Sequence, residues 1–475
     1  MPLSRSPFSG EVAPMQGNSF RCTSRGVTLS VGAVLVSVIA GCSSVQTASA
    51  PVGGGPVLAS AAGPPTFYAD VLPILQENCQ VCHQAAGRAT GGLVAPMALE
   101  SYEETRPWAD VIARAVNEGR MPPWGADARH EGTFQDERYL STGEKATLTA
   151  WAEAGAPAGD PSLAPSLAEA QQEKHGEWWL GEPDLVVGFA KPVHVGDEID
   201  DWQPTIPVPV SREQHPAARW IQSSELKPGG PYVHHIVSSH LGVGTPGRGA
   251  FTYPEGWGVL LPPDPVVTFN MHYNKKAGPG TAVADETLGA FKFYERGAVI
   301  DHVVQTDLNW QREFVIPAGA PDHEVSREMY FEEDTYLLSM GPHMHYRGKS
   351  VRVELEYPDG RREELLWVPK YDFKWQFLYQ YREPLLMPAG STLHTTWWFD
   401  NSVDNPYNPD PTADVRYGEE TFNEMANNRI YFAPAKPRGI VVGEPLPADV
   451  LEAAQEAEEQ RRQQLERAGA IADHL

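Results

Sequence analysis

The stretch Val351-Arg-Val-Glu-Leu-Glu-Tyr357 alternates apolar and polar residues, and Pro358-Asp-Gly360 follows it directly. An alternation with a period of two predicts a strand that has one buried and one exposed face. The Pro-Asp-Gly sequence predicts a tight turn into a returning strand. This segment therefore predicts a β-hairpin that packs one face against a core.

The same period recurs over much of the chain after about Trp178. No long helical pattern interrupts it before Pro447. The sequence therefore predicts an all-β region of the sandwich type. The aromatic residues that alternate after the hairpin are Phe373, Trp375, Phe377, Tyr379 and Tyr381.

This β region is too long for one ordinary sandwich, and it contains a weak internal sequence repeat. Phe314-Val-Ile-Pro-Ala-Gly319 is similar to Leu385-Leu-Met-Pro-Ala-Gly390. Strands are predicted over 266–273 and 392–399, each after a turn that contains proline. We predict two packed β-sandwiches, over 180–305 and 306–440.

Residues 441–475 have a charged, helical pattern. Leu451, Ala454 and Ala457 fall on one side of such a helix. The charges around the rest of the helix favour a solvated or loosely docked segment, and a coiled-coil contact is the alternative.

Ahead of the β region the pattern is helical. Ser141-Thr-Gly-Glu144 is a capping box that opens a helix through Trp151, and Gly155 ends it. The sequence predicts a small all-α domain over 66–160, with a Pro-containing linker over 161–179. A further helix is predicted between Pro107 and Glu118 from the spacing of Trp108, Ile112, Ala115 and Val116.

Cys79-Gln-Val-Cys82-His83 lies within this helical segment. Two cysteines two residues apart, followed at once by histidine, are typical of covalent c-type haem attachment. The cysteines would bond to the vinyl groups, and His83 would bind the iron. A C-x-x-C pair alone would also suit redox or zinc chemistry, and a surface dithiol beside an unrelated histidine is the structural alternative.

Met121-Pro-Pro-Trp124 offers a second axial ligand. Methionine sulfur is a common iron ligand opposite histidine in cytochromes c, where it raises the potential. The two prolines remove backbone donors and stiffen the loop. The alternative is a core methionine at the end of a helix. With this order of helices and motifs, residues 66–160 resemble a class I cytochrome c domain that holds haem c through Cys79, Cys82, His83 and Met121.

Length and charge limit the classes of function. The chain has 475 residues, of which 41% are hydrophobic, and a formal net charge of −25. This length is enough for about three domains. This acidity argues against nucleic acid as a partner, because phosphate groups bind to basic surfaces. It also disfavours binding to anionic lipid.

The first residues have the pattern of a targeting segment. Arg21 and Arg25 precede an apolar run from Val27 to Ala40, and Gly41-Cys42 follows. The run is too short to span a bilayer comfortably and ends in small residues, as in a signal peptide. The cysteine after the cleavage point resembles a bacterial lipobox. An ordinary signal peptide with a chance cysteine is the alternative.

This pattern predicts a lipoprotein signal peptide over 1–41, lipidation of Cys42 and a flexible tether over 42–65. The chain would then be extracytoplasmic, facing the periplasm and attached to a bacterial membrane through its lipid alone. The residue after the lipidated cysteine is Ser43 and not an aspartate that would act as a retention signal, which favours the outer membrane. The sequence contains four cysteines. Cys22 would leave with the leader and the other three would be modified, so none remains for a disulfide.

Histidines cluster in strand-like sequence of the β region. His234-His235 lies in one predicted strand, His272 in another, and His343-Met-His345 in a third. Residues i and i+2 of a strand face the same side, so His343 and His345 can approach one ion. Adjacent histidines alternate faces, so His234 and His235 need a twist or bulge to do so. Imidazole suits copper, zinc and iron, although a single strand histidine is usually structural.

In the order and spacing of these motifs, 220–435 resembles the copper type II, ascorbate-dependent monooxygenases, the peptidylglycine- and dopamine-hydroxylating family. The resemblance implies two jelly-roll-like domains that each hold one copper ion across an open cleft. It implies that His234, His235 and His272 bind one copper and that His343 and His345 bind the other. Gly418-Glu-Glu-Thr-Phe-Asn-Glu-Met425 is similar to the segment that supplies the family's methionine ligand, which implies Met425.

The resemblance implies insertion of one oxygen atom from O2 into a C–H bond of a small molecule or peptide. The copper at His343, His345 and Met425 would bind oxygen, and the other would store an electron. The haem would deliver electrons in place of ascorbate or beside it, from a redox partner protein. The family's disulfides have no counterpart here, because the β region lacks cysteine. The family's substrate-anchoring residues also have no match.

Other functions fit parts of the same sequence. A haem and copper lipoprotein that only transfers electrons would need the same ligands without turnover. A haem-only carrier or sensor would bind no copper. A structural lipoprotein would use its histidines in ordinary hydrogen bonds. Copper stoichiometry and turnover of a C–H substrate distinguish these possibilities.

Overall fold

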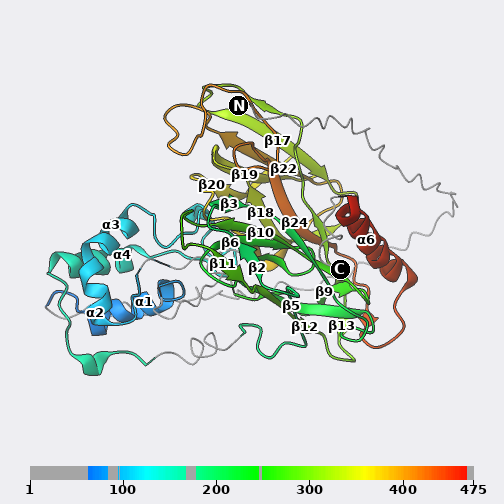
Figure 1. Cartoon of the computed structure of the whole chain (residues 1–475), viewed down its shortest axis with the longest axis horizontal. Helices are drawn as coiled ribbons and strands as arrows, with labels where there is room; N and C mark the ends of the chain where they lie inside the picture. Colours follow the sequence, from blue (N-terminus) through cyan, green and yellow to red (C-terminus); the bar gives the residue numbers. More distant parts are fainter. Residues whose placement is uncertain (1–62, 84–94, 96, 167–177, 245–248, 468–475) are drawn as a thin grey trace, which may run out of the picture. The chain divides into compact units, whose positions relative to one another are not determined.

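The computed structural model describes residues 63–83, 95, 97–166, 178–244 and 249–467. The predicted signal peptide and Cys42 lie outside them, as does most of the predicted tether. The described residues are mostly β, with helices near the beginning and at 448–467 (Figure 1). Among them, no helix is both long and apolar enough to cross a membrane.

The helical part has its own small core. Its central residues are Phe67, Leu75, Leu148 and Trp151, all without exposed surface. The predicted capping box is present, because the Ser141 side chain accepts from the Glu144 N–H and the Glu144 side chain accepts from the Ser141 N–H. The helices are α1 (Leu72–Asn78), which continues a π-helical turn over Phe67–Val71, α2 (Tyr102–Thr105), α3 (Ala109–Asn117) and α4 (Thr142–Glu153).

Two sheets and a short two-stranded pair form between residues 185 and 303, with a shared core that includes Ile221, Val267 and Phe291. The first sheet has the order β1 (Leu185–Gly188), β12 (Leu288–Phe293), β5 (Arg219–Lys227), β9 (Trp257–Leu261) and β14 (His302–Val303), with β8 (Phe251–Thr252) on β5. The second has the order β3 (Asp201–Trp202), β10 (Val266–Asn274), β6 (Val233–Ser238) and β7 (Gly242–Gly244), with β4 (Thr205–Pro209) on β10. The short pair is β2 (Val193–Val195) with β11 (Val283–Asp285).

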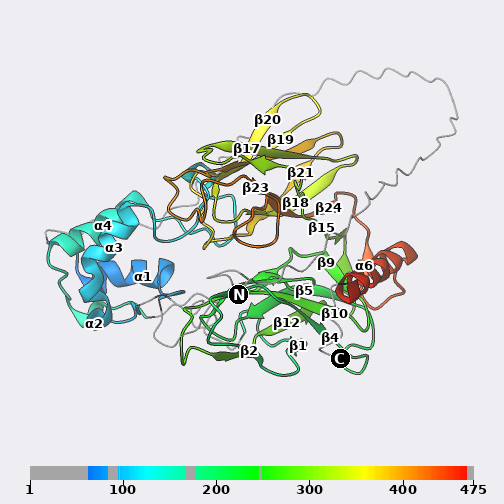
Figure 2. The same cartoon turned by 45° about the horizontal axis from the view of Figure 1, so that its top comes forward.

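Two four-stranded sheets form between residues 305 and 434, and Figure 2 shows them as two layers. Met340, Val353 and Trp397 are fully buried in their core. One sheet has the order β15 (Gln305–Asp307), β24 (Asn427–Pro434), β18 (Thr335–His343) and β21 (Tyr379–Met387). The other has the order β17 (His323–Tyr330), β22 (Thr392–Phe399), β19 (Gly348–Glu356) and β20 (Arg362–Val368). Short pairs join β16 (Val315–Ile316) to β23 (Val415–Arg416) and β13 (Val299–Ile300) to β25 (Ile440–Val441).

The predicted hairpin is the pair β19 and β20. Val351 pairs with Val368, Glu356 pairs with Arg362, and Gly360 in the turn has a φ of 82°. Of the five alternating aromatic residues, only Tyr379 and Tyr381 lie in a strand. Strand β18 pairs with β21 only as far as Met340 and Tyr379 and continues beside β24 alone. Among the described residues, no strand pairs with 369–378, and this segment forms a loop.

Residues 124–139 pack against the second pair of sheets. Trp124 and Phe134 are buried in the core of those sheets. The Tyr379 hydroxyl donates to the Trp124 carbonyl over 3.0 Å, and the Asp127 N–H donates to the Trp367 carbonyl over 2.8 Å. The segment that follows Met121 is thus held by the β region as well as by the helices.

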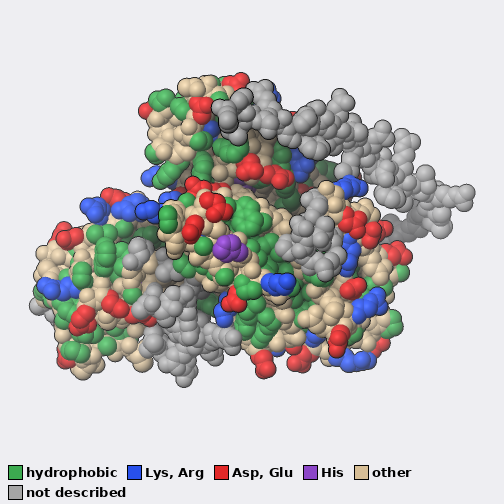
Figure 3. Space-filling view, in the orientation of Figure 1, with side chains coloured by type: hydrophobic (Ala, Val, Ile, Leu, Met, Phe, Trp, Pro, Cys, Tyr) green, Lys and Arg blue, Asp and Glu red, His purple; other side chains and the backbone are tan. Residues whose placement is uncertain are grey.

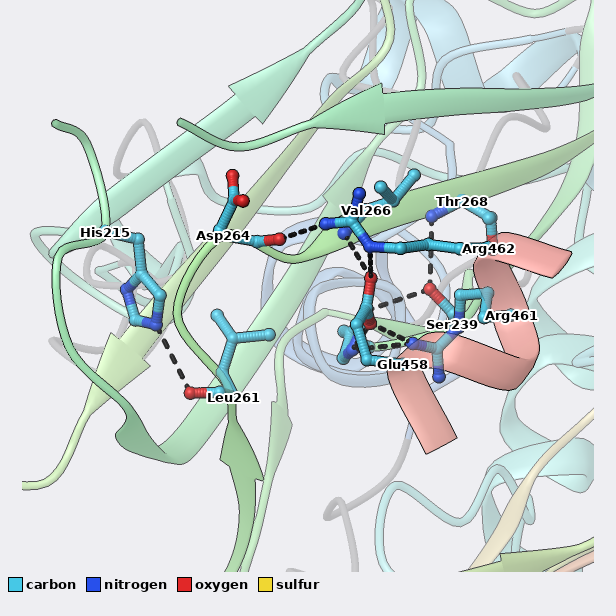
Figure 4. A network of polar contacts seen from close by, with 10 residues as sticks. His215, Ser239, Leu261, Asp264, Val266, Thr268, Glu458, Arg461 and Arg462 are labelled. Atoms are coloured by element: carbon cyan, nitrogen blue, oxygen red, sulfur yellow. Dashed lines mark hydrogen bonds and ion pairs between the residues drawn. The ribbon is translucent and has the colours of Figure 1, made fainter. Parts of the chain in front are cut away.

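Helix α6 (Ala448–Arg467) is docked, whereas the sequence favours a solvated or loosely docked segment. Glu458 is 6% exposed and accepts a hydrogen bond from the Val266 N–H over 2.7 Å (Figure 4). Arg461 and Arg462 form ion pairs with the same carboxylate. A buried glutamate is rare unless it is paired, and only the fold supplies these partners, so the charge pattern misleads here.

Replacing Glu458 with alanine is expected to lower the free energy of unfolding by about 3 kcal/mol. The change leaves the Val266 N–H without its acceptor and Arg461 without its carboxylate, and breaking a buried pair has a cost of this order. Urea unfolding would measure it. Glu456→Ala, on an exposed position of the same helix, is the matched control and should change little. Equal stability of the two variants would contradict the docking described.

Candidate metal sites

Three imidazoles converge where strands β6 and β10 pair. The Nδ1 atom of His234 lies 3.1 Å from Nδ1 of His235 and 3.2 Å from Nδ1 of His272. The third side of the triangle, from His272 to His235, is 3.4 Å. Since metal–imidazole bonds are about 2 Å long, one ion fits at the centre of this triangle. Within the described residues, this is the one group of three or more His, Cys, Asp or Glu side chains with such spacing.

A β-bulge brings the adjacent histidines to one side. His235 pairs with His272 and Val233 pairs with Tyr273, so His234 is the extra residue on β6. A bulge re-aims the side chains of the strand that contains it. The irregularity that His234 and His235 require in order to share an ion is therefore present.

Asp201 orients the third histidine. Strand β3 pairs with the end of β10, which places the Asp201 carboxylate 3.0 Å from Nε2 of His272. Burial alone would raise the pKa of Asp201. The hydrogen bond and the electrostatic attraction from His272 oppose this effect, and the net pKa of the carboxyl lies below its ordinary value. A carboxylate on the far nitrogen fixes the proton there and leaves Nδ1 to a metal, as metal-binding histidines generally require.

His343 and His345 present a second pair of imidazoles at the end of β18. Their ring centres are 5.1 Å apart, and the intervening Met344 is fully buried. Nδ1 of His343 lies 2.7 Å from Oε1 of Gln376, and Nδ1 of His345 lies 3.3 Å from the Asn423 carbonyl. Both contacts place the proton on Nδ1, so Nε2 of each ring remains as the nitrogen for an ion.

Four of these histidines, His234, His235, His343 and His345, are neutral at physiological pH. Burial lowers the pKa of His234 to about 3, that of His343 to about 4 and that of His345 to about 3. The pKa of His235 is also lowered by burial, and neighbouring imidazoles lower it further. Histidine (purple) covers only a small part of the face drawn in Figure 3. Neutral imidazole is the form that binds metals.

Met425 shares a cavity with the second pair and with His235 of the first group. The cavity has a volume of about 380 Å³, and His235, His343, His345 and Met425 all line it. Asn427 donates a weak hydrogen bond to the Met425 sulfur over 3.8 Å. Two imidazoles with a thioether are soft to borderline ligands and suit copper, above all Cu(I).

Phe373 lies between the two groups of histidines. Its ring centre is 5.6 Å from that of His234, on which it stacks, and 5.9 Å from that of His345. It also lies 5.8 Å from His272 and 6.5 Å from His343. Phe373 therefore contacts rings of both groups, while His235 and the second pair also line one common cavity.

The Cys79–His83 motif forms one turn after α1. The backbone N–H groups of Cys82 and His83 both donate to the Cys79 carbonyl. Nδ1 of His83 lies 3.0 Å from the Met97 carbonyl, which leaves Nε2 for an iron. Burial raises the pKa of the Cys79 thiol to about 12, whereas reactive redox cysteines have a lowered pKa. In this respect the Cys79 thiol is unlike a reactive redox cysteine.

Met121 lines the same small cavity as this motif. Its other walls include Pro122 and Pro123, and the cavity has a volume of about 140 Å³. Met121 and His83 thus border the same cavity. Cys79 and Cys82 also line this cavity and form no disulfide within the described residues.

Sequence reasoning missed three residues that shape these sites. Asp201 and Gln376 hold two histidines in orientation, and Phe373 contacts both groups. Asp201 is 71 residues from its partner, and Gln376 is 33 residues from its own. No local motif marks either contact. The aromatic alternation around Phe373 was the one available signal, and it predicted a strand instead.

Comparison with known proteins identifies no family. No family model matches the chain, and no curated protein matches it. Among solved structures, the major capsid protein P2 of bacteriophage PM2 covers 54% of this chain and 99% of its own, at 6% identity and a TM-score of 0.24. The VP2 subviral particle of infectious bursal disease virus covers 53% and 72%, at 9% identity and a TM-score of 0.19. These likenesses are too weak to indicate a common fold.

Proposed function

We propose that this chain is a copper-dependent monooxygenase that hydroxylates a C–H bond with O2 and receives its electrons through a fused c-type haem. In this proposal the helical part is a cytochrome c domain, and the two β parts are jelly-roll-like domains with one copper each. The protein would be an extracytoplasmic lipoprotein anchored through Cys42. Its substrate would be a small molecule or peptide, with ascorbate or a redox protein as the source of electrons.

One observation carries the proposal: two different ligand sets line a single cavity. A set of three imidazoles reaches it through His235, and a set of two imidazoles and a thioether reaches it through His343, His345 and Met425. Bound copper would store one electron at each set and activate O2 for insertion into a C–H bond. Bound haem would supply single electrons from outside. Unequal ligand sets suit a division between oxygen chemistry and electron storage.

The chain's own residues prepare both sets before any ion arrives. Asp201 holds the Nε2 proton of His272, and Gln376 holds the Nδ1 proton of His343. The buried carboxylate of Glu424 accepts from the N–H groups of His345 and Arg347, which fixes the backbone around the second pair. Sites held in this way lose little freedom when they bind a metal.

Polar side chains give the cavity a means to orient a substrate. Thr205, Asn270, Asn427 and Arg429 line its walls beside the histidines. Phe373 and Phe377 supply apolar surface near the same space. A pocket of polar groups on an apolar frame is typical of small-molecule sites.

Metal analysis followed by a product search tests this proposal. Protein matured with haem and supplied with copper is expected to bind two copper ions per chain. With isotopically labelled O2, an untargeted search should find products that carry one labelled oxygen atom. Two copper ions with haem oxidation but no labelled product would support an electron-transfer lipoprotein instead. Absence of copper binding would leave the histidines with structural roles.

A further inference from the structure

Trp375 belongs to the wall of the cavity around the Cys79–His83 motif. It lines this cavity together with Cys79, Cys82, His83 and Met121. It comes from the loop 369–378 between β20 and β21, far along the chain from the other lining residues. The indole is therefore the part of the β region that borders the proposed haem.

Gln376, the next residue of the same loop, contacts His343, a proposed ligand of the oxygen-binding copper. The Oε1 atom of Gln376 lies 2.7 Å from Nδ1 of His343. One peptide link and one short hydrogen bond thus connect the wall of the haem cavity to an imidazole of the second pair. Phe373, two residues before Trp375, stacks on His234 and extends the contact to the three-histidine group.

The loop is held in one conformation by its own contacts. The Trp375 N–H donates to the Asp372 carbonyl over 2.9 Å, and the Gln376 amide donates to the Phe373 carbonyl over 3.0 Å. The Trp375 and Phe377 rings are parallel within 4°, with centres 6.3 Å apart. Tyr371 hydrogen-bonds to both the N–H and the carbonyl of Met344, which lies between the two histidines.

We propose that Trp375 and Gln376 form the route by which electrons pass from the haem site to the site of His343 and His345. This inference rests on the proposed function. With haem and copper bound, these residues would pass one electron: iron would change from ferrous to ferric as copper changed from cupric to cuprous, and no proton would move. A second electron would follow once an external one-electron donor had reduced the haem again. Trp375 and Gln376 are positioning residues, because they act between the two centres.

The test is the rate of haem oxidation within one molecule. In copper(II)-loaded protein without O2, a flash-excited ruthenium complex reduces the haem, and haem absorbance follows its reoxidation. Trp375→Leu is expected to slow this step by about tenfold or more, because it removes the aromatic ring from the wall of the haem cavity; for comparison, loss of a residue that supports a metal ligand lowers activity by about 10- to 100-fold. Gln376→Leu, which removes the hydrogen bond to His343, should have a similar effect. Trp375→Phe, which keeps an aromatic ring, should remain close to the wild type.

Trp398→Leu is the matched control. Trp398 is also half-buried, but it lies on β22, where it packs against Trp367 of β20, and it lines neither cavity. Haem midpoint potentials are measured for every variant, so that a change in driving force is separated from a change in route. Wild-type rates in both Trp375→Leu and Gln376→Leu at unchanged potentials would overturn the route. If Trp375→Leu fails to mature, the rate in Gln376→Leu decides.

The two levels of the proposal fail in different ways. If copper leaves haem oxidation in the wild type unchanged, or if no copper binds, the proposed function is wrong and the route falls with it. If oxidation depends on copper but is insensitive to residues 375 and 376, the function stands and this route is wrong.

Discussion

Replacing His343 with alanine is expected to reduce the bound copper from two ions per chain to one and to lower product formation at least about 100-fold. Loss of a residue just outside the metal ligands typically costs 10- to 100-fold in affinity or activity, and loss of a ligand should exceed that. His345 and Met425 alone would be left to hold the ion. Copper analysis and the yield of labelled product give the two measurements.

His394→Ala is the matched control for this variant. His394 is half-buried like His343, but it lies on β22 beside Glu328 and Glu356 and belongs to neither group of histidines. It should keep two copper ions and full product formation. Product formation that survives in His343→Ala or in Met425→Ala would refute the assignment of the oxygen site.

Replacing Asp285 with alanine is expected to lower the free energy of unfolding by about 3–5 kcal/mol. Asp285 has no exposed surface and accepts hydrogen bonds from the hydroxyls of Tyr273, over 2.7 Å, and Thr287, over 3.0 Å. Its loss leaves two buried donors without an acceptor, and breaking such a buried network has a cost of this size. Chemical unfolding of metal-free protein would measure it.

Asp285 should also make stability depend on pH. Burial raises the pKa of this carboxyl above its ordinary value of 3.8, although its hydrogen bonds oppose the shift. The folded state therefore keeps the proton to higher pH than the unfolded state does. Stability from this group is greatest below pH 3.8 and falls as pH rises toward the folded pKa. Asp285→Asn removes this titration, so the stability of the wild type relative to Asp285→Asn should fall over that range. A constant difference would contradict the shift.

The elements that the sequence predicted well are those with local causes. The hairpin of β19 and β20 follows from alternation and a Pro-Asp-Gly turn, because a slip of one residue would expose its apolar face. Helix α4 begins at its capping box for reasons contained within four residues. His343 and His345 lie close together because one residue separates them, although β18 ends at His343 and His345 follows it.

The features that the sequence could not predict depend on distant partners. Residues 373–377 alternate like a strand, but β18 offers no edge beside them, so they form the loop that reaches both proposed cofactor sites. Glu458 has the sequence context of a solvated helix, yet the Val266 N–H and two arginines give it a buried position. Asp201 reaches His272 only because β3 pairs with β10. Such pairings are decided by the whole fold.

The contact between Glu458 and Val266 also bears on how the nascent chain matures. The two residues are 192 positions apart, and β13 likewise pairs with β25 across a long interval. During synthesis, β10 and β13 leave the ribosome well before helix α6 and β25 exist. Contacts that close so late are slow to form and leave apolar strands uncovered in the meantime. The sheets between residues 185 and 303 should therefore become resistant to proteases only after residues 440–467 have emerged from the ribosome. Until then, chaperones would be expected to bind the incompletely folded chain.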